Sequence, residues 1–145
     1  LKDAGITVAG GFLSPMEQDC LDILLRGKQP IILCPARRLK GMRLGSKVRQ
    51  AIDEERLLVL SMFNDSIQHT TAAQAVQRNN LVAALADALF VPYAAPNGKT
   101  WTTVHAAFKR NQPVYTFDME DNAALIGCGA IPFEIKLVIQ GNSGT

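Results

Sequence analysis

The stretch AVQRNNLVAALADALFVPYAAPNGKTWTTV, residues 75–104, decides the fold that the sequence predicts. Its pattern indicates a polar helix entrance at residues 78–80, an apolar helix as far as Ala88, and a buried strand over residues 89–93. The glycine-centred loop 95–100 then leads into a second helix. Since the first N–H groups of a helix are unpaired and lie at the positive end of its dipole, this loop is expected to bind an anion.

On either side of this stretch, short apolar runs alternate with helical patterns. The first helix is expected to begin with a capping box at Ser14 and Glu17, with Pro15 at its first position. Strands alternating with helices at this spacing predict an α/β three-layer sandwich around a mostly parallel sheet. The predicted strands cover residues 6–9, 30–34, 57–60, 113–117 and 135–139, and the other predicted helices cover 14–27, 44–55 and about 101–110.

Length and composition limit the classes of protein that need to be considered. The 145 residues are 48% hydrophobic and 19% charged, which is typical of one globular domain. No apolar run approaches the roughly 20 residues of a membrane helix, so we expect a cytoplasmic protein without a membrane partner. The net charge of +2 is too small to indicate a nucleic-acid partner by itself. Cys20, Cys34 and Cys128 lack metal-ligand spacing and are expected to be buried thiols, and we expect no metal or other cofactor.

Polar and glycine residues follow several of the predicted strands or begin the helices after them. Loops at the carboxyl ends of parallel strands meet at one rim of the sheet, where α/β proteins bind their ligands. Arginine suits bidentate phosphate contacts, lysine adds a point charge, and glycine lets a phosphate approach the backbone. The predicted phosphate or nucleic-acid site consists of Gly10, Gly11, Arg37, Arg38, Arg78, Asn79, Asn97, Gly98, Lys99 and Thr100.

Each of these signals has a plainer interpretation. A pair of glycines is also a common turn, and the two arginines at 37 and 38 are equally typical of a solvated loop. Arg78 has the alternative of an ion pair with an acidic residue such as Asp87. His69 is interpreted as a surface or capping group, because no second histidine or carboxylate is placed to form a catalytic set with it.

In their order along the chain, these motifs resemble the DprA/Smf family of DNA-processing proteins of bacterial transformation. The matching pieces are VAGG at 8–11, RNNLVAALA at 78–86, NGKTWTT at 97–103, PVYT at 113–116 and DNAALIGCGA at 121–130. The sequence departs from the family pattern at Ala9, where the family has serine, and at Asn80, where it has arginine. The first strand of the family and its G-[ST]-R loop are absent.

The resemblance implies a Rossmann-like domain over residues 1–139, followed by a flexible tail at 140–145. It also implies binding of single-stranded DNA through a phosphate-binding rim, a role in DNA uptake and recombination, a homodimer and a recombinase partner.

Two alternatives remain open. One is a nucleotide-binding protein related to the lysine-decarboxylase-like nucleotide hydrolases. The sequence predicts no hydrolase activity, since residues 96–103 lack the glutamate that those enzymes use. The other is a domain that serves only as an interaction scaffold.

Overall fold

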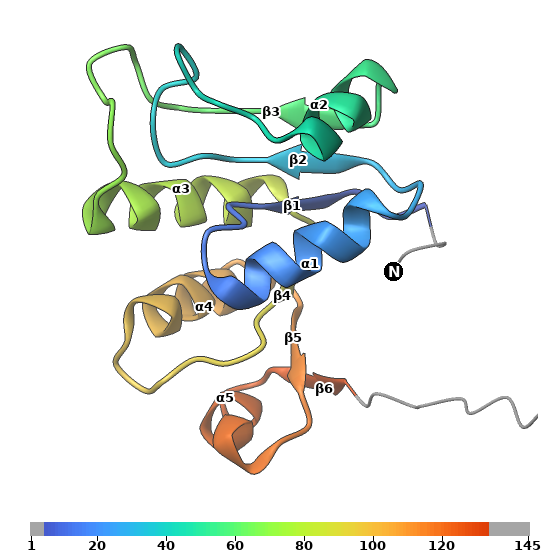
Figure 1. Ribbon diagram of the computed structural model, residues 1–145. Coiled ribbons are helices and arrows are strands. Elements are labelled where there is room, and N and C mark those ends of the chain that lie inside the picture. Colours follow the sequence, from blue (N-terminus) through green and yellow to red (C-terminus); the bar gives the residue numbers. More distant parts are fainter. Residues whose placement is uncertain (1–4, 134–145) are drawn as a thin grey trace, which may run out of the picture. The chain divides into compact units, whose positions relative to one another are not determined.

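The computed structural model describes residues 5–133, which fall into two compact units (Figure 1). Unit 1 extends to Ala86 and unit 2 begins at Asp87. Each unit has a three-stranded parallel sheet, in which the strands are connected through helices. The alternation of strands and helices that the sequence predicts is therefore correct within both units. The predicted tail at 140–145 and the predicted strand at 135–139 lie outside the described residues.

The sheet of unit 1 has the order β1-β2-β3, formed by Val8–Gly10, Ile31–Leu33 and Leu57–Val59. Ile31 lies in register with Val8 on one side and with Leu57 on the other. Helices α1 (Pro15–Leu25) and α2 (Ser46–Asp53) pack against the side chains of Ile31, Leu33 and Leu57 in this sheet. The core of unit 1 consists of Leu24, Ile31, Leu33, Ala51 and Leu57.

Capping boxes begin two of the helices in unit 1. The Ser14 hydroxyl accepts from the Glu17 backbone N–H, and a carboxylate oxygen of Glu17 accepts from the backbone N–H of Ser14 at 2.8 Å. Thr71 and Gln74 form the same arrangement at the start of α3 (Ala72–Leu85), which contacts β1. The helix begins at Ala72, as the alanines at 72, 73 and 75 predict, so residues 78–80 lie inside it and the predicted entrance at 78–80 is wrong. The helix also ends three residues before Ala88, at Leu85.

In unit 2, the sheet has the order β4-β5-β6, formed by Leu89–Phe90, Val114–Phe117 and Ile131–Phe133. Helices α4 (Lys99–Lys109) and α5 (Ala123–Gly127) supply core residues, and a short 3-10 helix, Glu120–Asn122, precedes α5. The core consists of Val91, Ala94, Val104, Ala107, Val114, Leu125 and Ala130.

Two strands of unit 2 differ from the sequence prediction. Strand β4 is shorter than predicted, since Pro92 has no N–H for the ladder and the last backbone bond to β5 comes from Val91, at 2.8 Å to the Tyr115 carbonyl. Strand β6 is not among the predicted strands, and the paired residue Pro132 weakens its sequence signal.

The cysteines differ in burial. Cys34 is buried as predicted, but Cys20 and Cys128 are exposed, so the prediction of three buried thiols is wrong at two positions. Cys20 lies off the stripe of α1 that carries Leu21 and Leu24 into the core. Over residues 5–133, no helix is long and apolar enough to cross a membrane, and no cluster of three potential metal ligands occurs.

Candidate functional site

Arg78 lies in the middle of α3 and is only 3% exposed. Its Nη1 donates to the Cys34 carbonyl oxygen at 2.9 Å, and its Nε donates to the Asn79 side-chain oxygen at 2.8 Å. Both acceptors are neutral. Among the described residues the ion pairs are Lys40 with Asp65 and Arg56 with Glu54, so Arg78 has no carboxylate at ion-pair distance there. An ion pair with Asp87, the alternative to a site role for Arg78, would join residues of different units and stays untested.

Gly11 allows the Arg78 guanidinium to reach the ends of strands β1 and β2. A Cβ atom on Gly11 would overlap this guanidinium, so a residue with a side chain there would force the guanidinium to move. The neighbouring strand ends are also joined directly, because the Cys34 N–H donates to the Gly10 carbonyl at 2.8 Å. The close approach that the sequence predicts at Gly11 is therefore made by a side chain of the same unit, while a role of Gly10 and Gly11 in binding a ligand stays a prediction.

The Arg78 guanidinium is a desolvated positive charge. Burial lowers the pKa of Arg78, and the negative charges of Glu17 and of an ionised Cys34 act in the opposite direction. The Glu17 carboxylate is already an acceptor for the Leu13 and Ser14 N–H groups at 3.2 and 2.8 Å. Arginine nevertheless stays protonated near neutral pH. A buried charge without a paired counter-charge is costly, and an anion that reaches it is bound strongly.

Arg78 lines a hollow of about 310 Å³, which we call the arginine hollow. Arg37 also lines it, and the Arg37 carbonyl is held by the Ser61 hydroxyl at 2.6 Å. In contrast, Arg38 links two loops, donating from Nη1 to the Asp65 carbonyl at 2.6 Å. The complete lining is Gly11, Leu13, Pro35, Ala36, Arg37, His69, Thr70 and Arg78.

The predicted site did not include five members of this lining, and two of these five, His69 and Thr70, have polar side chains. Both are exposed and immediately precede Thr71, the residue that caps α3. The available signal was their position before the helix that carries Arg78. That signal does not show which other loop lines the hollow with them, and Arg37, which also lines it, follows a different strand.

The second group of predicted residues lies in unit 2, at the start of α4. Gly98 is the N-cap residue and has no side chain that could cap the helix. Its own backbone N–H donates to the Ala95 carbonyl at 3.0 Å. Asn97, which precedes it, has a left-handed backbone with φ 62°. Lys99 and Thr100 are exposed in the first turn, so the predicted helix start with free N–H groups is present. Because Gly98 and Arg78 belong to different units, their convergence on one rim stays a prediction.

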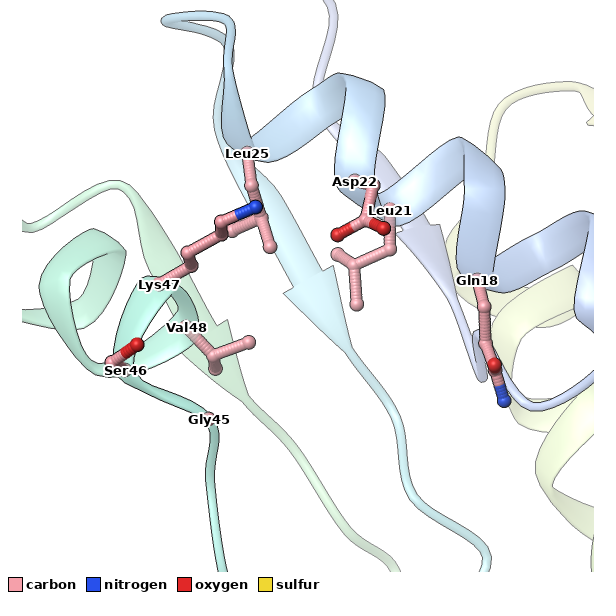
Figure 2. A pocket seen from close by; sticks show the side chains of 8 residues that line it. All are labelled: Gln18, Leu21, Asp22, Leu25, Gly45, Ser46, Lys47 and Val48. Atoms are coloured by element: carbon pink, nitrogen blue, oxygen red, sulfur yellow. The ribbon is translucent and has the colours of Figure 1, made fainter.

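A larger groove in unit 1, of about 370 Å³, is less suited to an anion (Figure 2). It lies between α1 and the first turn of α2, where Leu21 and Val48 point toward each other. Its charged lining residues are Asp22 and Lys47, whose opposite charges offset each other. The arginine hollow, with two arginines and no acidic residue in its lining, is therefore the better candidate site.

Comparisons with known proteins bear on the family and the fold of the chain. A family model described as DNA recombination-mediator protein A matches residues 41–131. A solved structure of DNA processing protein A from Helicobacter pylori, described for its single-stranded DNA binding mode, matches with a TM-score of 0.63 and 20% identity. The match covers 86% of this chain and 59% of that one. The likeness confirms the predicted Rossmann-like α/β fold. Compared with curated proteins, the chain has no match.

Proposed function

This chain belongs to the DNA recombination-mediator protein A family, and from that premise we propose that it binds single-stranded DNA through phosphate contacts in the arginine hollow. The observation that carries the proposal is the buried Arg78 guanidinium, which has no carboxylate partner within residues 5–133. The similar protein from Helicobacter pylori was described for single-stranded DNA binding. The proposed setting is DNA uptake and recombination in the cytoplasm.

Phosphate binding follows from the charges and their surroundings. Each nucleotide of a strand carries one negative charge, and a guanidinium offers it paired donors in one plane. Because Arg78 is desolvated and Arg37 is half-buried, both interact with a phosphate through a lower effective dielectric than bulk water. Asn97, Gly98, Lys99 and Thr100 at the start of α4 supply a further proposed phosphate contact, which lies in unit 2.

We propose binding rather than catalysis. The loop before α4 has no glutamate, and no acidic residue lies among the described residues that line the arginine hollow. The glutamate that the related nucleotide hydrolases use as a proton carrier is therefore not in that loop. The second candidate function is binding of a free nucleotide, which the size of the hollow favours, because small-molecule sites begin at about 300 Å³. By the family resemblance we also propose a homodimer and a recombinase partner.

Fluorescence anisotropy with labelled oligo-dT tests the proposal. Arg37→Ala is expected to weaken binding about tenfold, and to lower the slope of log affinity against log salt by about 0.7 for the lost phosphate contact. Lys99→Ala tests the contact in unit 2 in the same way. Lys47→Ala is the matched control, since Lys47 is an exposed cation of unit 1 that lines the other groove.

Oligo-dT affinity that is unchanged in both Arg37→Ala and Lys99→Ala would remove the proposed site. Binding of thymidine monophosphate, without any binding of oligo-dT, would favour the nucleotide alternative instead. Release of free base from that nucleotide would contradict the proposal that the protein is not an enzyme.

A further inference from the structure

We propose that the arginine hollow selects a phosphate monoester, such as the phosphorylated end of a DNA strand, over the phosphodiesters inside the strand. This inference rests on the proposed function, because it concerns the same hollow. It adds the chemical class of phosphate that the hollow binds best. Three observations support it: the charge of the lining, the hydrogen bonds that already hold the Arg78 guanidinium in place, and the size of the hollow.

The charge of the lining matches a dianion. Of the described residues that line the hollow, two are arginines and none is acidic. Glu17, whose charge acts on Arg78, accepts two backbone hydrogen bonds at the start of α1 and is absent from the lining. A phosphate monoester carries a charge of about −1.5 to −2 at pH 7, whereas a diester carries one negative charge. Two arginines in the lining, neither with a carboxylate at ion-pair distance among the described residues, therefore favour the monoester.

The guanidinium of Arg78 is fixed before any ligand arrives. With Nε and Nη1 donating to Asn79 and Cys34, Nη2 is the nitrogen that has no hydrogen bond within residues 5–133. A fixed donor costs little conformational entropy on binding, and it distinguishes ligands by how closely their charged oxygens approach. A monoester presents three terminal oxygens, whereas a diester presents two.

The size of the hollow favours a strand end for a related reason. At about 310 Å³ it lies at the lower limit of small-molecule sites. Leu13, Pro35 and Ala36 make part of its wall apolar. An internal phosphate carries a nucleoside on both sides, and both must leave the hollow. A terminal phosphate has one such connection and needs one exit.

His69 and Thr70 complete the lining with exposed side chains. The Thr70 hydroxyl is a hydrogen-bond donor for a phosphate oxygen, and the His69 imidazole donates from one nitrogen or from both. Neither group repels an anion. The lining thus contains four residues whose side chains are able to donate to a phosphate and none whose side chain carries a negative charge.

The test compares two oligo-dT strands that carry the same 3′ fluorophore and differ only in a 5′ phosphate or a 5′ hydroxyl. The phosphorylated strand is expected to bind about tenfold more tightly, which is the effect of one additional charge-assisted hydrogen bond. Arg37→Ala is expected to abolish this ratio. Lys99→Ala, in unit 2, should weaken both strands and leave the ratio unchanged. Thermal unfolding of each variant shows whether it is folded. Arg37→Lys is included as a variant that keeps the positive charge at position 37.

A competition arm identifies the source of the phosphate. Inorganic phosphate and thymidine monophosphate are expected to displace the phosphorylated strand from the wild-type protein, whereas thymidine is not. Equal affinity for the two strands, with both weakened by Arg37→Ala, would overturn this inference and leave the proposed function standing. Failure of both strands to bind would overturn the proposed function itself.

Discussion

Each unit has a buried polar side chain that joins the ends of two neighbouring strands, but the two side chains differ in charge. In unit 1, Arg78 donates to the Cys34 carbonyl after β2 and lies against Gly11 after β1. In unit 2, the Asn122 side-chain amide donates to the carbonyls of Pro92 and Phe117, which follow β4 and end β5, at 2.9 and 3.1 Å. Asn122 is 1% exposed and Arg78 is 3% exposed.

The difference in charge between Asn122 and Arg78 shows which property is needed to hold the strand ends together. A neutral amide is sufficient to hold the strand ends in unit 2, so a positive charge is not needed for that task. Unit 1 nevertheless buries a guanidinium, at a desolvation cost that an amide would avoid. Arg78 lines the arginine hollow, whereas Asn122 is absent from its lining. We infer that the additional charge in unit 1 serves an anionic ligand.

The largest expected effect comes from removing the charged side chain. Arg78→Ala leaves the Cys34 carbonyl without its side-chain donor and opens space beneath Gly11, so we expect a loss of about 3 kcal/mol in unfolding free energy. Urea unfolding of the full chain measures this loss, and anisotropy with oligo-dT should show weakened binding. Unchanged binding in a folded Arg78→Ala variant would contradict a role of Arg78 beyond packing.

The corresponding change in unit 2 sharpens the comparison. Asn122→Ala removes the donor of two carbonyl hydrogen bonds, for which we expect a loss of about 2 kcal/mol in unfolding free energy. Because Asn122 is neutral and absent from the arginine hollow, the variant should retain its affinity for the strand under conditions in which it is folded. Loss of oligo-dT affinity in the folded variant would remove the distinction between the two units.

A smaller effect is expected at Gly11. Gly11→Ala places a methyl group where the Arg78 guanidinium lies, so the guanidinium must shift, at a cost of about 1.5 kcal/mol in unfolding free energy. Gly127→Ala is the matched control, since an added Cβ there meets no atom within 4 Å and the residue lies in α5. Equal unfolding midpoints for the two variants would show that the close approach at Gly11 is unimportant.

Sequence patterns predicted the features of this fold that depend on near neighbours. The partners of the capping box, Ser14 and Glu17, are three positions apart, so both are visible in one short motif. The burial of Arg78 was not predictable in this way, because its acceptor Cys34 is 44 positions away. The role of Asn122 was missed for the same reason, since one of its acceptors, Pro92, is 30 positions away.

The sequence predicted several residues of the candidate site, but not how they are arranged in space. The sequence selected Gly11, Arg37 and Arg78, which line one hollow, but it dismissed His69 as a surface or capping group. Arg38 was grouped with Arg37 because the two are adjacent in sequence, yet its guanidinium holds the Asp65 carbonyl. Adjacent residues in a loop point in different directions, and the sequence does not contain that information.

The smallest expected effect concerns the thiol beside Arg78. Burial raises the pKa of Cys34 above its ordinary value of 9.0, and the positive charge of Arg78 offsets part of that rise. A raised pKa in the folded state means that the unfolded chain releases the proton first. The contribution of Cys34 to stability is therefore complete below pH 9.0 and is lost as the pH rises through the folded-state pKa.

The measurement is the unfolding free energy of the full chain between pH 7 and pH 10, at fixed ionic strength. Wild-type stability should fall above pH 9.0 by at most about 1.4 kcal/mol per pH unit for this one group, and Cys34→Ala should lack that component. Cys128→Ala is the matched control, because the Cys128 thiol is exposed in unit 2. If Cys34→Ala and Cys128→Ala change the pH profile equally, the buried thiol does not distinguish unit 1 from unit 2.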